Sequence, residues 1–232
     1  MAVPPTTEEA FIREVDEELR RDTLQGFWKK WGRVLIGATL GGLALFGGWL
    51  WWQERRIETA GKEGEELTRS LEALSAGNAA GAEKGLTGLA GSDVEGHRVL
   101  ALLAQADLAL QKGDTKKAAE TYGKIAADAD FAQPWRDLAL VRQTSAEYES
   151  LKPDQVVARL KPLAVAGNPW FGSAGELTAM AYLKMGKPDL AGALFAAMAK
   201  DEKVPDTIRS RAVQMAGTLG VDAVLPATKA DQ

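Results

Sequence analysis

No charged residue lies between Arg33 and Glu54, and this uncharged stretch constrains the fold more than any other feature of the chain. Its 19 residues VLIGATLGGLALFGGWLWW, at positions 34–52, are enough to cross about 30 Å of hydrocarbon at about 1.5 Å per helical residue. Five of the seven tryptophans lie before or at the end of this stretch, at the two positions where indole rings favour the level of the lipid headgroups. The sequence therefore predicts one transmembrane helix at 34–52.

We predict that this helix is an uncleaved anchor and that the N-terminus lies in the cytoplasm. Trp51 and Trp52 are too bulky for a signal-peptidase site, which needs small residues. Five Lys or Arg residues lie in the 20 residues before the span and four in the same length after it, a small bias toward a cytoplasmic N-terminus. The alternative, a core helix of a soluble domain, does not explain tryptophans at both ends.

Small residues recur along one side of the predicted span, at Gly37, Gly41, Ala44 and Gly48. Their spacings of four, three and four place them on one helix face, where small side chains let another helix approach closely. We predict that this strip binds a partner in the membrane. The alternative is that glycine is simply frequent in transmembrane helices.

A three-residue pattern recurs four times after the span: one residue, then an aromatic or aliphatic residue four positions on, then another three further. The first members are 36, 38 and 35 residues apart, close to the period of about 34 residues of tetratricopeptide repeats, in which helical hairpins stack. A turn with glycine, proline or an Asx residue precedes each set, as expected between two helices. The sets are Ala82, Leu86 and Leu89; Ala118, Tyr122 and Ile125; Val156, Leu160 and Leu163; and Ala191, Phe195 and Met198.

The first helix of each pair also carries packing positions. Ala106, and Ala179 with Tyr182, are small or aromatic residues where neighbouring helices must approach closely. The third pair departs from the pattern, because Thr144 and Glu147 stand where such residues are expected. We expect the repeats to pack through Ala82, Leu86, Ala106, Ala118, Tyr122, Leu160, Ala179, Tyr182, Ala191 and Phe195.

The predicted fold is all-α: one N-terminal transmembrane helix, then a tetratricopeptide-like α-solenoid of about four helix pairs. No strand-like alternation of polar and apolar residues appears. A last amphipathic stretch predicts a capping helix over the open end of the stack. Its apolar positions are Ile208, Ala212, Met215 and Leu219. We expect a cytoplasmic tail at 1–33, the span at 34–52, the repeat domain at 53–220 and a flexible tail at 221–232.

Composition excludes the commonest catalytic and metal sites. The chain has no cysteine and a single histidine, His97, so Ser-His, Cys-His and multi-histidine zinc sites cannot form. His97 stands at the start of a predicted helix, where a solvated or locally bonded imidazole is expected. The formal net charge of -4 gives no basic surface for nucleic acid. We predict no enzyme activity, no cofactor, no metal, no nucleic-acid partner and no small-molecule substrate.

The N-terminal tail predicts a short amphipathic helix. Thr6 and Glu9 form a capping box ahead of Phe11, Val15 and Leu19, which recur at four-residue steps. The tail carries seven acidic residues and three arginines before Phe27, and this excess of negative charge disfavours binding to anionic lipid. This helix either faces a protein partner or is solvated.

The order of these parts is similar to that of a known family. The segment FIREVDEELRRDTLQGFWKKWG precedes the span, and degenerate repeats follow it and end in KDEKVPDTIRSRAVQMAGTLG. Over nearly its whole length the chain resembles the ancillary SecYEG translocon subunit family, the YfgM-like proteins with a tetratricopeptide-like domain. The most specific pieces are VDEE at 15–18, WKKWG at 28–32 and Arg211-Ala212 in the last predicted helix.

The resemblance implies a bacterial inner-membrane protein with a cytoplasmic N-terminus and a periplasmic repeat domain. Members of that family associate with the translocon and with periplasmic chaperones, and the family has no catalytic residues. We therefore predict a membrane-anchored interaction module that links the protein-conducting channel to periplasmic chaperones or emerging chains. The alternative is a periplasmic scaffold in envelope assembly or cell division.

Overall fold

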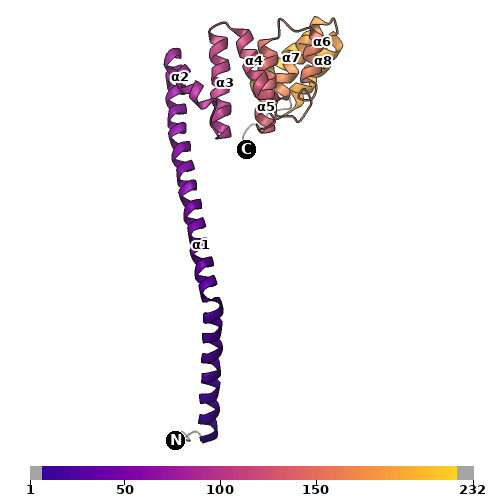
Figure 1. Cartoon of the computed structure of the whole chain (residues 1–232). Coiled ribbons are helices and arrows are strands. Elements are labelled where there is room, and N and C mark those ends of the chain that lie inside the picture. Colours follow the sequence, from indigo (N-terminus) through magenta and orange to yellow (C-terminus); the bar gives the residue numbers. More distant parts are fainter. Residues whose placement is uncertain (1–6, 224–232) are drawn as a thin grey trace, which may run out of the picture. The chain divides into compact units, whose positions relative to one another are not determined.

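The computed structural model describes residues 7–223 of the 232, with side chains from Trp28 onward. All regular structure in these residues is helical, with nine α-helices and no strand, which confirms the predicted all-α class (Figure 1). The chain divides into two compact units, Met1–Gly61 and Lys62–Gln232.

One helix, α1 (Thr7–Ser75), contains the tail helix, the apolar span and the stem that the sequence predicts as separate segments. No proline lies within it, and single glycines are tolerated inside a helix at a cost of about 1 kcal/mol each. The capping box stays a prediction, because Thr6 lies outside the described residues.

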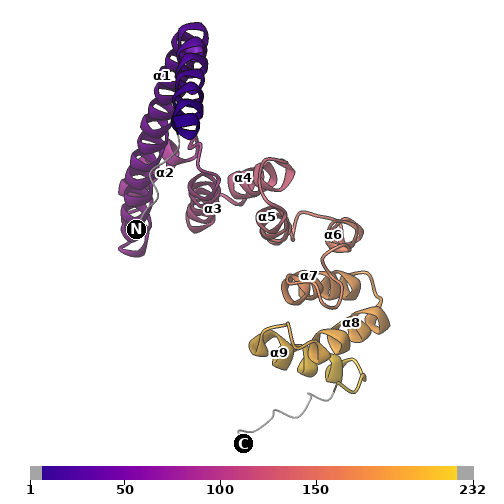
Figure 2. The ribbon, with the colours of Figure 1, turned by 90° about the horizontal axis from the view of Figure 1, so that it is seen from below.

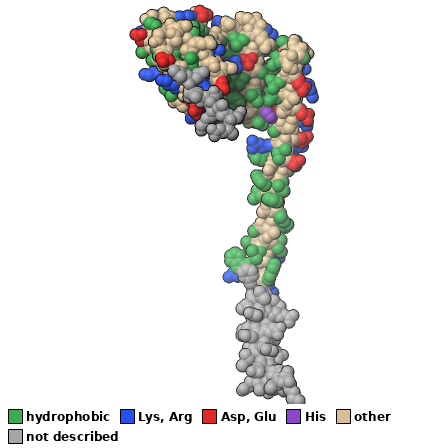
Figure 3. Space-filling view, turned by 180° about the vertical axis from the view of Figure 1, so that it is seen from behind, with side chains coloured by type: hydrophobic (Ala, Val, Ile, Leu, Met, Phe, Trp, Pro, Cys, Tyr) green, Lys and Arg blue, Asp and Glu red, His purple; other side chains and the backbone are tan. Residues whose placement is uncertain are grey.

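In the first unit, the apolar segment of α1 is exposed on all sides. By length and composition it is the one segment of the described chain that is long and apolar enough to cross a membrane, and none of its most apolar window is buried. Leu45, for example, is 79% exposed. Figure 3 shows hydrophobic side chains along this segment without Lys, Arg, Asp or Glu. A core helix of a soluble domain buries such side chains, and within this unit nothing covers them.

In the second unit, four helix pairs follow one another and a ninth helix closes the row. The C-terminal part of α1 pairs with α2, α3 with α4, α5 with α6, and α7 with α8. Figure 2 shows α3, α5, α7 and α9 along the inner side of an arc, and α4, α6 and α8 along its outer side. The helices are α2 (Ala79–Leu89), α3 (Glu95–Gln111), α4 (Thr115–Ala127), α5 (Gln133–Ala146), α6 (Pro153–Leu160), α7 (Phe171–Lys184), α8 (Pro188–Lys200) and α9 (Asp206–Thr218).

The turns inside the pairs lie where the sequence predicts them. Gly77, Gly113 and Gly186 adopt φ values of 76°, 78° and 69°, a left-handed conformation that glycine takes without a steric penalty. Asn78 caps α2 and Asp114 caps α4, each by accepting a hydrogen bond from a backbone N–H of the next turn. Three of the four pairs thus turn at a glycine, and the connection between α5 and α6 has none.

The predicted packing positions form the core of the second unit. All twelve residues of the four recurring sets are buried, and Tyr122, Phe195 and Leu86 are among the largest fully buried side chains. Of the ten residues expected to pack the repeats, nine are buried and Tyr182 is only partly so. Thr144 is also fully buried. Its hydroxyl tolerates burial because it donates a hydrogen bond to the carbonyl of Leu140, one turn earlier in the same helix.

The capping helix predicted near the C-terminus is α9. Ala212 is fully buried, and Ile208, Met215 and Leu219 pack partly buried around it. Packing continues past the predicted domain end at residue 220, since Val221 and Ala223 join the same cluster. The rest of the predicted flexible tail, 224–232, lies outside the described residues.

Candidate functional site

A groove opens on the inner side of the arc between α5 and α7, with a volume of about 480 Å³. We call it the inner groove. Its apolar surface comes from Trp170, Leu177 and Met180, and Met180 is 41% exposed. Arg142 and Glu176 add one charge of each sign. This combination suits a protein segment with apolar anchors.

Tyr148 lines the inner groove and has an unused hydrogen-bonding group. Its hydroxyl is buried without a hydrogen-bond partner among the described residues. Burial raises the pKa of this hydroxyl, so it stays protonated and remains a donor at neutral pH. The ammonium of Lys184 lies 4.3 Å from the ring centroid and covers one ring face.

Ion pairs join the consecutive helices of the inner side at a constant sequence spacing of 35 residues. Asp107 and Arg142 lie 3.8 Å apart, and Lys184 lies 3.1 Å from Glu149. Arg211 binds both carboxylate oxygens of Glu176. Exposed pairs of this kind contribute about 0–1 kcal/mol each, so their main effect is to fix helix register.

Arg142 is the cation that lines the inner groove, and its ion pair with Asp107 is weak. Its distance of 3.8 Å from Asp107 is long for a charge-assisted hydrogen bond, and its side chain is 54% exposed. Asp107 also accepts a hydrogen bond from the hydroxyl of Tyr122, so the carboxylate is shared between the core and the rim. Burial, followed by this hydrogen bond, raises the pKa of Tyr122. Arg142 therefore remains able to bind a carboxylate of a partner.

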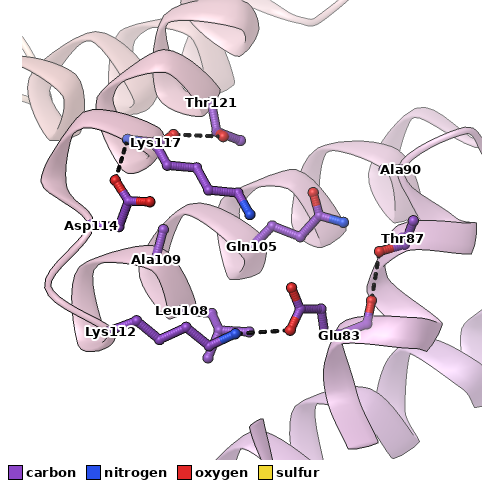
Figure 4. Close-up of a pocket in the computed structure, with 10 residues that line it drawn as sticks. All are labelled: Glu83, Thr87, Ala90, Gln105, Leu108, Ala109, Lys112, Asp114, Lys117 and Thr121. Carbon is purple, nitrogen blue, oxygen red and sulfur yellow. Dashed lines mark hydrogen bonds and ion pairs between the residues drawn. The ribbon is translucent and has the colours of Figure 1, made fainter. Parts of the chain in front are cut away.

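A second cavity of about 430 Å³, the outer pocket, lies among α2, α3 and α4. In Figure 4 the side chains of Lys117 and Gln105 both extend into it, while Lys112 reaches Glu83 at 2.8 Å. The Thr87 and Thr121 hydroxyls donate to carbonyls of their own helices. The outer pocket thus contains the ion pair of Lys112 with Glu83 and one further ammonium, that of Lys117. No nucleophile in this pocket lies beside a base.

His97 is locally bonded. Its Nδ1 lies 3.2 Å from the carboxylate of Glu63, which also accepts a 2.5 Å hydrogen bond from the hydroxyl of Ser92. This hydroxyl, more than the imidazole, lowers the pKa of Glu63. Through these contacts, Glu63 in the C-terminal part of α1 binds Ser92 just before α3 and His97 in its first turn. The described residues contain no group of three His, Cys, Asp or Glu side chains that would hold a metal ion.

The small-residue strip of the span has no contact within its unit. A Cβ added at Gly37, Gly41 or Gly48 meets no atom within 4 Å, and Ala44 is exposed. The strip is therefore open to another helix, and its role in binding a partner stays a prediction.

The sequence predictions did not include the residues of the inner groove. Trp170 lies in the connection before α7, and Arg142 and Met180 belong to different helix pairs, so no local pattern joins them. A signal was present in the recurrence of opposite charges 35 residues apart, which marks the helices that line the groove.

Comparison with known proteins gives one match. The family model described as a tetratricopeptide repeat-like domain matches residues 25–216. No curated protein and no solved structure matches the chain.

Proposed function

Because the chain belongs to the tetratricopeptide repeat-like domain family, we propose that it is a membrane-anchored protein-interaction module whose inner groove binds a protein segment. Domains of this family typically mediate protein–protein interaction. The observation that carries the proposal is the groove itself, where the exposed Met180 and the half-buried Trp170 lie beside the loosely paired Arg142. The apolar segment of α1 supplies the anchor.

The finer proposal is an ancillary role at the protein-conducting channel. In this role, the transmembrane helix lies beside the channel, and the repeat domain contacts periplasmic chaperones or emerging chains. Anchoring would raise the local concentration of two weak binders, so modest affinity in the inner groove would suffice. The resemblance of the tail and of the last helix to YfgM-like proteins supports this role.

Capture of partners from intact membranes tests the proposal. The full chain, solubilised in mild detergent after crosslinking, should retain translocon subunits together with periplasmic chaperones. Recovery of cell-wall or division proteins in their place would favour the scaffold alternative. Recovery of no protein above an unrelated single-span control would contradict the interaction module.

Leucine at Gly41 should reduce the recovery of membrane partners and leave insertion intact. The added side chain has room within the chain itself, but it would hold a partner helix away from the strip. The matched controls are Gly42→Leu and Gly47→Leu, which add the same bulk on other faces of the helix. Equal recovery from all three variants and the unaltered chain would make the span an anchor only.

A further inference from the structure

Two arginines directly after the span are held on tryptophan rings. The guanidinium carbon of Arg55 lies 5.1 Å from the ring centroid of Trp51, and that of Arg56 lies 4.7 Å from the centroid of Trp52. Each pair is four residues apart, so that one helical turn places the cation over the ring. Both distances are within the range of a cation–π interaction.

This arrangement leaves the donors of both guanidinium groups free. Over a ring, a guanidinium presents one face, while its five N–H donors point outward in its own plane. Neither Arg55 nor Arg56 makes a hydrogen bond or ion pair with any residue that the structure describes. The two cations are thus positioned but not neutralised.

The other end of the span lacks this arrangement. Lys29, Lys30 and Arg33 also lie near tryptophans in sequence, but in the described part of the chain the cation–π pairs beside the span are those of Arg55 and Arg56. The positioned cations therefore occur at one boundary only, the one that faces the repeat domain along the chain.

We propose that Arg55 and Arg56, stacked on Trp51 and Trp52, each bind the phosphate group of an anionic phospholipid at this boundary. The inference rests on the proposed membrane anchor, since it places the indole rings at the headgroup level, where lipid phosphates lie. Two planar forks match phosphate oxygens bidentately, which a lysine ammonium does not. A zwitterionic lipid binds more weakly, because its own ammonium already balances its phosphate.

Native mass spectrometry of the full chain in nonionic detergent tests this site. The chain is titrated with phosphatidylglycerol or with phosphatidylcholine of the same acyl chains. We expect phosphatidylglycerol to bind tighter by clearly more than the roughly fivefold per charge that a basic side chain of either kind contributes at a membrane surface. Arg55→Gln with Arg56→Gln should abolish the difference. Trp51→Leu with Trp52→Leu should reduce it, because the cations lose their platform.

Two further variants separate a built site from diffuse charge. Arg55→Lys with Arg56→Lys keeps both charges and should lose the part of the preference that exceeds this roughly fivefold per charge. Arg69→Gln with Lys84→Gln removes two exposed charges away from the span and should leave the preference unchanged. Equal affinities for the two lipids in the unaltered chain, or full preference in the lysine variant, would overturn the site.

Insertion is measured separately, by whether the reconstituted chain stays with vesicles at alkaline pH. A chain that stays in the vesicles but shows no lipid preference would overturn the phosphate site and leave the anchor standing. A chain released from the vesicles would overturn the anchor and the site with it.

Discussion

Alanine at Phe195 is expected to lower the free energy of unfolding of the repeat domain by about 3–5 kcal/mol. The side chain is 1% exposed and lies in the cluster that joins α7, α8 and α9. Its removal leaves a cavity that rigid neighbouring helices cannot fill, so the cost exceeds the loss of apolar burial alone. Tyr122→Ala should cost a similar amount, because Tyr122 is fully buried between α3 and α4.

Urea denaturation of a fragment from Ile57 onward, followed by circular dichroism, measures this effect. The fragment should itself be soluble, helical and cooperative, since each helix pair packs on its neighbours. Leu190→Ala on α8 is the matched control: this leucine is 48% exposed, and its loss should cost less than about 1 kcal/mol. Losses below about 1 kcal/mol at both Phe195 and Tyr122 would show that the repeat register is wrong.

Aspartate at Met180 is expected to reduce partner recovery by about tenfold or more. A bound segment would cover the new carboxylate beside Leu177 and Trp170, and taking a charge out of water costs several kcal/mol. An ion pair between the new carboxylate and Arg142 would offset part of this cost but would occupy the cation that the segment needs. Met180 is 41% exposed in the free chain, so the fold should tolerate the change. Quantitative mass spectrometry of proteins captured with the full chain measures the recovery.

The control for Met180→Asp is Leu190→Asp. It introduces the same charge at a similarly exposed leucine, but on α8, which does not line the inner groove. If both variants lose partners equally, the loss reflects added charge rather than the groove. If neither loses any, the inner groove is not the binding surface.

The repeat architecture was predictable because it depends on local chemistry. Turn glycines such as Gly113 and Gly186 and the spacing of buried residues within each second helix are visible in the sequence, and all twelve recurring positions are buried. Tyr182 packs against the core cluster but is only partly buried, unlike the other expected packing residues. Periodicity places a residue on a helix face, whereas its depth depends on how the next helix covers that face.

The length of α1 and the inner groove were not predictable in the same way. The sequence indicates a tail helix, a span and a stem, but nothing local shows that the helix passes through all three without a break. The groove brings Arg142 and Met180 of adjacent helix pairs into one cavity, and this depends on how α5 and α7 are rotated relative to each other. Curvature accumulates from small rotations between repeats and leaves no motif.

Protease accessibility most directly tests the central claim, that α1 anchors the repeat domain outside the cytoplasm. The full chain, tagged at each end, is expressed in bacteria, and protease is added to spheroplasts. We expect the domain after the span to be degraded while the N-terminal tail is protected, and both to be degraded once the membrane is dissolved. A protected domain with a cleaved tail before Phe27 would reverse the orientation, and release of the intact chain without detergent would contradict the anchor.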